Sequence, residues 1–130
     1  MEQSNYIIDT NSVIDYLGNK LPKPGLNFLN IVIDEGPIIS IITKIEVLGF
    51  NTSEANQNLL LNFINDAIIL DLSSDVVDTC IKLRKKYKIK LPDAIIAATA
   101  LTYELTLITR NLSDFKNISE IKTINPYSLI

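Results

Sequence analysis

The stretch that decides the fold is Tyr6-Ile7-Ile8-Asp9-Thr10-Asn11-Ser12. Its apolar residues predict a short strand, and the polar residues after Asp9 predict the start of a helix. In an open parallel sheet, ligands bind just outside the carboxyl ends of the strands. The carboxylate of Asp9 is therefore expected at such a crevice. A second interpretation is that Asp9 only caps the helix, because Asp is a good N-cap residue.

Apolar segments alternate with segments of helical periodicity along the rest of the chain. This favours the α/β class, as a three-layer α/β/α sandwich around a central parallel sheet of four to five strands. The whole chain, residues 1–130, has the size of one domain. Strands are predicted over 5–8, 37–42, 68–72, 106–109 and 122–124, and helices over 10–17, 26–35, 43–50, 59–66, 73–87 and 92–105, with a turn or short helix over 111–115.

The composition excludes several kinds of chemistry. The chain has no histidine, which excludes Ser-His-Asp and Cys-His catalysis and zinc sites built on imidazole. The single cysteine, Cys80, lies in a helical pattern and is interpreted as a small core residue. No apolar run approaches the roughly 20 residues that span a bilayer, and the N-terminus has no positively charged signal region. We therefore expect a cytoplasmic protein with no membrane contact.

Three further acids occupy positions similar to that of Asp9. Glu46 and Asp114 each follow a predicted strand, and Asp93 opens the most apolar of the predicted helices. Parallel strands end at one edge of a sheet, and a helix that returns between them starts at that same edge. The four carboxylates are therefore expected to converge there.

Each of these acids also has a purely structural interpretation. Thr43-x-x-Glu46 fits a capping box, and the helix dipole favours Asp93 in a first turn. Asn111-x-x-Asp114 fits another cap pair. The remaining acids have no such placement and are expected to be solvated or to cap helices; among them are Asp15, Asp66, Asp75 and Glu120.

Taken together, the four carboxylates favour a metal site over four separate caps. Like charges gathered at one crevice repel one another, and a divalent cation is the natural counter-charge. Ligands that are all oxygen suit Mg²⁺ or Mn²⁺. Such ions activate water and stabilise the charge that develops during cleavage of a phosphodiester. This chemistry needs no protein general base, which fits a chain without histidine.

Four motifs, in this order and spacing, carry a resemblance to a known family. They are Ile8-Asp9-Thr10-Asn11, Thr43-x-x-Glu46-Val47-Leu48-Gly49, Leu91-Pro92-Asp93-Ala94-Ile95-Ile96-Ala97-Ala98-Thr99-Ala100 and Leu107-Ile108-Thr109-Arg110-Asn111-Leu112-Ser113-Asp114-Phe115. The chain resembles a PIN-domain ribonuclease, and most closely a VapC-type toxin of a type II toxin–antitoxin pair. The resemblance covers nearly the whole length.

The resemblance implies Mg²⁺- or Mn²⁺-dependent cleavage of RNA. It implies that Asp9, Glu46, Asp93 and Asp114 bind the metal and carry catalysis. It also implies a homodimer, and a cognate antitoxin that inserts a peptide at the active site. The polar residues that are similar to the family's supporting residues around the metal are Thr10, Asn11, Thr43, Thr109 and Asn111.

The basic residues are distributed unevenly. The net charge of −3 argues against a general affinity for nucleic acid, but six of the twelve Lys and Arg residues lie between Lys82 and Lys90. This run is interpreted either as a solvated helix end or as a phosphate-binding edge. Arg110 is expected to hold a phosphate or to pair with a neighbouring acid. The candidate RNA-binding residues are Arg84, Lys85, Lys86, Lys88, Lys90 and Arg110.

Three other functions compete with a toxin ribonuclease. A haloacid dehalogenase-type phosphatase also begins with a strand and an Asp, but it needs a second Asp where this chain has Asn11. A PIN nuclease of RNA processing would use the same site without an antitoxin. A catalytically inert PIN-like binding module would keep the fold and use the acids only as caps.

Overall fold

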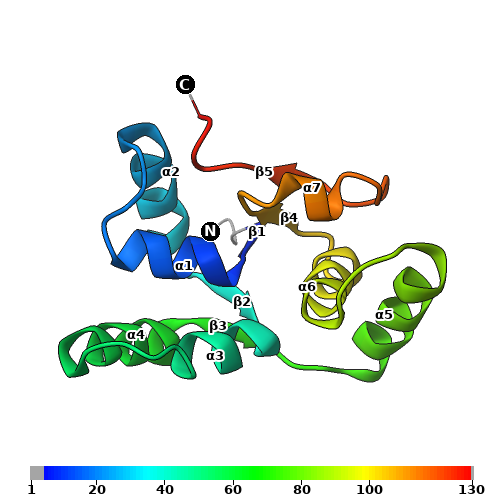
Figure 1. Cartoon of the computed structure of the whole chain (residues 1–130), viewed down its shortest axis with the longest axis horizontal. Coiled ribbons are helices and arrows are strands. Elements are labelled where there is room, and N and C mark those ends of the chain that lie inside the picture. Colours follow the sequence, from blue (N-terminus) through cyan, green and yellow to red (C-terminus); the bar gives the residue numbers. More distant parts are fainter. Residues whose placement is uncertain (1–4, 130) are drawn as a thin grey trace.

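A computed structural model describes residues 5–129 of the chain. Strands and helices alternate along these residues, as the sequence predicts (Figure 1). The elements are β1 (Tyr6–Ile8), α1 (Thr10–Leu17), α2 (Lys23–Asp34), β2 (Ile38–Ser40), α3 (Ile41–Leu48), α4 (Glu54–Asp66), β3 (Ile68–Leu70), α5 (Ser74–Lys86), α6 (Leu91–Thr102), β4 (Thr106–Ile108), α7 (Leu112–Phe115) and β5 (Thr123–Ile124).

All the strand pairs among the described residues are parallel. β1 pairs with β4, β4 pairs with β5, and β2 pairs with β3. β1 and β2 also lie side by side, so the strands follow the order β3-β2-β1-β4-β5, although the hydrogen-bonded ladder is interrupted between β2 and β1. The predicted parallel sheet is therefore confirmed, with this one interruption.

The sheet separates two hydrophobic cores, because successive side chains of a strand point to opposite faces. Ile7 and Leu107 pack into the core formed with α5 and α6, whereas Ile8 and Ile108 pack into the core formed with α1 to α4. Figure 1 shows α5 and α6 on one side and the other long helices on the opposite side. The predicted three-layer sandwich is confirmed. Cys80 lies buried in the first core, as its interpretation as a core residue required.

Two predicted boundaries near the second strand are wrong. The apolar run over 37–42 divides, because β2 ends at Ser40 and α3 begins at Ile41. The Ser40 hydroxyl oxygen accepts a 3.0 Å hydrogen bond from the amide of Ile42 and starts the helix early. An apolar run of this length fits a buried strand or a buried helix equally well. The helix after it therefore starts two residues before the predicted position.

Three other helices differ from their predicted ranges. α2 begins at Lys23 rather than at residue 26, because Pro24 is tolerated in a first turn. α4 begins at Glu54, where the Ser53 side chain caps it, rather than at residue 59. α6 ends at Thr102 instead of residue 105, and Glu104 just beyond has a positive φ of 55°. Across residues 5–129, no helix has both the length and the apolar character needed to cross a bilayer.

Candidate active site at the carboxyl edge of the sheet

Asp9 lies where β1 ends and α1 begins, and its position serves both of the interpretations offered above. The amide of Ser12 donates a 2.8 Å hydrogen bond to Asp9 Oδ1, so the carboxylate does cap α1. Asp9 is only 5% exposed. Burial raises its pKa, while hydrogen bonds from Thr109 and Ser12 and the charge of Arg110 act in the opposite direction. The cap therefore holds a desolvated carboxylate at the carboxyl edge of the sheet.

Glu46 is held by α1 and not by its own helix. The predicted capping box with Thr43 is wrong, because Ser40 is the N-cap of α3 and Thr43 lies buried inside that helix. The hydroxyl of Thr10 lies 2.6 Å from Glu46 Oε1 and 3.2 Å from Thr43 Oγ1. The carboxylate of Glu46 therefore points toward the start of α1, because Thr10 is the residue that follows Asp9.

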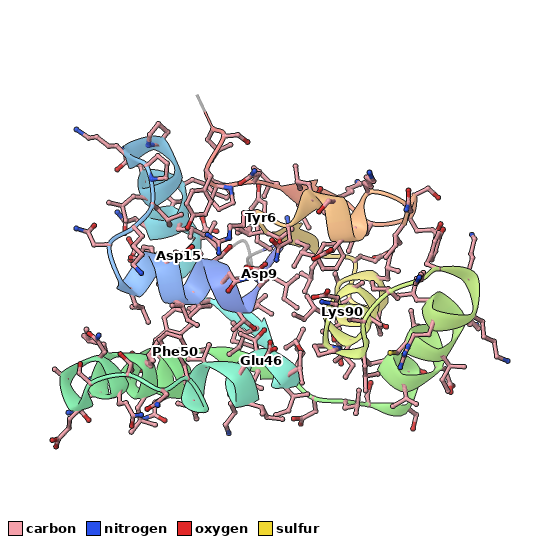
Figure 2. The ribbon with its side chains drawn as sticks, viewed as in Figure 1. Tyr6, Asp9, Asp15, Glu46, Phe50 and Lys90 are labelled. Carbon is pink, nitrogen blue, oxygen red and sulfur yellow. The ribbon has the colours of Figure 1, made fainter. Side chains whose placement is uncertain are left out.

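The pKa of Asp93 is affected by the charges of all three other candidate acids. It stands in the first turn of α6, where Pro92 also lies, as the sequence predicts. Burial raises the pKa of Asp93, and the charges of Asp114, Glu46 and Asp9 raise it further, while Lys90 opposes them. Figure 2 shows Asp9 near the middle of the molecule, with Glu46 below it and Lys90, at the start of α6, to its right. Asp93 thus lies within electrostatic range of each of the other three carboxylates.

The donor set fits a hard divalent cation by its chemistry. All four candidate side chains offer only carboxylate oxygens. After burial, the charges of the other three acids raise the pKa of Asp93, and a bound cation would relieve this repulsion. With the side chains as they stand, no three acidic or cysteine side chains of residues 5–129 are arranged to hold an ion. The residues that would hold one are Asp9, Glu46, Asp93 and Asp114.

The predicted supporting residues surround these acids to different degrees. Thr109 is fully buried, and its hydroxyl oxygen accepts a 3.0 Å hydrogen bond from the amide of Asn111. Asn11 lies half-buried in the first turn of α1. The cap pair predicted for Asn111 and Asp114 is not formed by the Asn111 side chain, and the two residues are joined through the backbone instead. Asp114 is exposed.

The basic run between Lys82 and Lys90 contributes three cations to the acidic edge, which is the carboxyl edge of the sheet with its four candidate acids. Arg84, Lys88 and Lys90 line a groove of about 500 Å³ together with Asp93 and Asp114. The other two candidates of the run lie elsewhere. Lys85 lines a separate apolar groove, and Lys86 Nζ lies 3.6 Å from Glu120 Oε1.

Arg110 pairs with Asp15, an acid whose position in the sequence predicts that it is solvated or caps a helix. Asp15 is buried, and its Oδ2 atom lies 3.2 Å from Arg110 Nη1. The Tyr127 hydroxyl donates a hydrogen bond to the same oxygen. The expectation for Asp15 was therefore wrong, because α1 turns this side chain inward, toward β4 and the C-terminal segment. No local signal marks this pairing, because Arg110 and Tyr127 lie 95 and 112 positions from Asp15 in the sequence.

The fold and this edge define the class of protein. The sequence profile described as "PIN domain" matches residues 6–121. The chain therefore belongs to the PIN domain family, as its four motifs predict. No curated protein is matched by its sequence.

Comparison with solved structures shows which members of the family this chain resembles. A toxin–antitoxin complex from Klebsiella pneumoniae contains a chain that is 31% identical, with a TM-score of 0.77 over 95% of this chain and 99% of that one. A DNA-bound VapBC from Salmonella typhimurium contains a 25% identical chain, with a TM-score of 0.80 and coverage of 97% and 99%. VapBC2 from Rickettsia felis is likewise 25% identical, with a TM-score of 0.76 and coverage of 92% and 97%. The resemblance to a VapC-type toxin is thereby confirmed.

Proposed function

We propose that this protein is the toxin of a toxin–antitoxin pair and cleaves RNA as a Mg²⁺- or Mn²⁺-dependent endoribonuclease. The observation that supports this most strongly is the electrostatic coupling of Asp93 to Asp9, Glu46 and Asp114 at the carboxyl edge of a PIN fold. Helix capping accounts for Asp9 but not for Glu46, because Ser40 caps α3 and the Thr10 hydroxyl holds Glu46 instead. A phosphodiester hydrolase that relies on metal gives such an arrangement a use.

The residues of the chain would prepare the site in distinct ways. When bound, the divalent cation supplies an activated water and stabilises the charge at the phosphorus centre. Asp9 is fixed by the Ser12 amide and Glu46 by the Thr10 hydroxyl, so these two carboxylates are oriented before a cation arrives. The groove lined by Arg84, Lys88 and Lys90 adjoins Asp93 and would attract the phosphates of the RNA.

Two macromolecular partners belong to the same proposal. The Klebsiella pneumoniae structure is a toxin–antitoxin complex, and the Salmonella typhimurium structure is a VapBC bound to DNA. By this likeness, the protein binds a cognate antitoxin that covers the acidic edge and blocks cleavage. It also forms a homodimer, as the family resemblance implies.

The central experiment compares the wild-type protein with the Asp93→Asn variant. Because Asp93 is a proposed metal ligand, the variant should lose at least about 100-fold in the rate of RNA cleavage with Mn²⁺, the upper end of the cost of losing a residue that only supports a metal ligand. Cleavage of a mixed RNA sample is measured by sequencing the new ends. Growth on expression is recorded in parallel, since a toxin should arrest growth only when Asp93 is intact.

The matched control is Glu104→Gln, which removes an acid beside the amino end of β4, at the opposite edge of the sheet. It should cleave RNA and arrest growth as the wild type does. Full activity in Asp93→Asn would contradict the assigned role. Cleavage without growth arrest, and with no effect of a co-expressed antitoxin, would instead favour a nuclease of RNA processing.

A further inference from the structure

We propose that Arg110 binds a phosphate of the substrate on the Asp9 side of the site, and that Asp15 and Tyr127 are positioning residues that hold its guanidinium there. The inference rests on the proposed nuclease function and adds a second contact region to it. The basic groove lies on the Asp93 and Asp114 side. An RNA strand bound in this groove and crossing the four candidate carboxylates would therefore reach Arg110 at the other side of the site.

The geometry around Arg110 is built from three separate parts of the chain. Arg110 follows β4, Asp15 lies on α1, and Tyr127 belongs to the segment after β5. Asp15 Oδ2 accepts hydrogen bonds from both Arg110 and Tyr127, and the Arg110 Cζ atom lies 5.6 Å from the centre of the Tyr127 ring. An acid and an aromatic ring thus fix the plane of the guanidinium from two directions.

Within the pair, Asp15 is buried and Arg110 is accessible to solvent. The Asp15 side chain is 11% exposed, whereas 47% of the Arg110 side chain is in contact with solvent. A guanidinium carries five N–H donors, so contact with Asp15 does not exhaust its capacity to bind a phosphate. The charge of Arg110 also acts, as the smallest of several causes, to lower the pKa of Asp9, so the guanidinium lies within electrostatic range of that carboxylate. Figure 2 shows Asp15 and Asp9 along α1, with Lys90 on the other side of Asp9 from Asp15.

A purely structural role and a simple charge effect make different predictions for Asp15→Asn. Removal of a negative charge should strengthen RNA binding if only the net charge counts. Loss of the partner that orients Arg110 should weaken it. The sign of the change therefore distinguishes positioning from general electrostatics. If the three residues only tie the C-terminal segment to α1, neither Asp15→Asn nor Arg110→Gln should change the salt dependence of binding.

The experiment measures binding in the Asp93→Asn background, so that the probe is not cleaved. A short single-stranded RNA of mixed sequence is titrated at several salt concentrations with constant Mg²⁺. Arg110→Gln should weaken binding about tenfold, as expected for one charge-assisted contact. It should also lower the slope of log Kobs against log salt by about 0.7, the value for one phosphate contact on a single strand. Arg110→Lys should keep the slope but recover the affinity only in part.

The control variant is Lys122→Gln, which removes a positive charge beside the amino edge of the sheet. It should change affinity less than twofold. Urea denaturation of every variant verifies that the fold is retained. Asp15→Asn should weaken binding, and Tyr127→Phe should weaken it less because the ring remains. The proposal is overturned if Arg110→Gln behaves as Lys122→Gln does, or if Asp15→Asn tightens binding. If the wild-type protein neither binds nor cleaves RNA, the nuclease function is overturned as well. If it cleaves RNA while Arg110→Gln behaves as Lys122→Gln does, only the role of Arg110 is overturned.

Discussion

At the scale of single residues, Asp9 combines a structural task with a proposed chemical one. Its carboxylate accepts the Ser12 amide and is almost fully buried, so it stabilises α1 while its charge is poorly solvated. The two interpretations drawn from the sequence, a cap and a site residue, are therefore compatible. Variants that differ only in charge can separate them.

We expect Asp9→Asn to retain the stability of the wild type but to lose activity, because Asn caps a helix as well as Asp does. Asp9→Ala should lose the cap and about 1 kcal/mol of unfolding free energy. Urea denaturation at neutral pH measures the stability, and RNA cleavage measures the activity. Equal destabilisation by the two substitutions would show that the charge of Asp9, rather than its cap, stabilises the fold.

Tyr127 gives a second prediction at this scale, on the pH dependence of stability. Burial and the hydrogen bond to Asp15 raise the pKa of Tyr127 from 10.0 to about 12. Between these values the unfolded chain loses the phenolic proton before the folded chain does. The contribution of Tyr127 to stability is therefore complete below pH 10 and declines toward pH 12.

The matched comparison for this prediction is Tyr127→Phe. The difference in unfolding free energy between wild type and variant should be largest below pH 10 and should shrink as the pH rises toward 12. All other titrating groups are common to the two proteins and cancel in the difference. A difference that stays constant over this range would mean that the Tyr127 hydroxyl titrates alike in both states.

At the scale of elements, the contact between α2 and the C-terminal segment shows what local periodicity leaves out. Figure 1 shows this segment running beside α2 after β5. Gly25 is buried in the first turns of α2, and a Cβ atom there would lie 1.9 Å from the carbonyl oxygen of Pro126. The sequence predicts a loop through Gly25, whereas the structure uses this glycine for close approach of two backbones.

We expect Gly25→Ala to lower the unfolding free energy by about 1–3 kcal/mol, the usual cost of overpacking. The direction is informative, because Gly→Ala within a helix ordinarily stabilises by about 1 kcal/mol. Asn27→Ala, at an exposed position of the same helix, is the control and should be neutral or stabilising. Thermal unfolding provides the measurement. A Gly25→Ala protein as stable as the wild type would mean that the Pro126 segment moves away at little cost.

The helix starts show which local signals can be relied on. Ser73 caps α5 through its side chain, and Pro92 lies in the first turn of α6, so both helices begin within one residue of their predicted starts. The predicted start of α3 failed because Ser40 lies within an apolar run that also suits a strand. Signals in polar segments were missed as well, because Ser53 starts α4 five residues before its predicted position and Pro24 lies in a first turn of α2 that was predicted as loop.

At the scale of the whole molecule, the acidic edge is a product of the fold. Asp9, Glu46, Asp93 and Asp114 come from four different elements, and only the sheet and its crossovers bring their charges within range. Repulsion among them should make the free protein less stable than a protein with a bound cation. Binding of metal should therefore stabilise the native state by mass action.

We expect Mn²⁺ to raise the unfolding free energy by about 2.7 kcal/mol at a concentration about 100 times its Kd. The increase should be lost when Asp93 and Asp114 are both replaced by Asn. Thermal unfolding with increasing Mn²⁺ measures the effect, with Glu104→Gln as the control. If Mn²⁺ changes the unfolding free energy of neither the wild type nor Glu104→Gln, the edge holds no divalent cation. The alternative of a catalytically inert binding module then gains support.

The sequence by itself determined the α/β class, the absence of histidine chemistry, and the placement of four acids after strands or at a helix start. These features depend on composition, apolar periodicity and residues a few positions apart. Only the tertiary structure decided that Thr10 holds Glu46 across 36 positions, and that Arg110 and Tyr127 meet Asp15 across 95 and 112 positions. Such pairings depend on how helices cross the sheet, and the energy that selects them comes from packing the two cores. No local pattern records where those crossings occur.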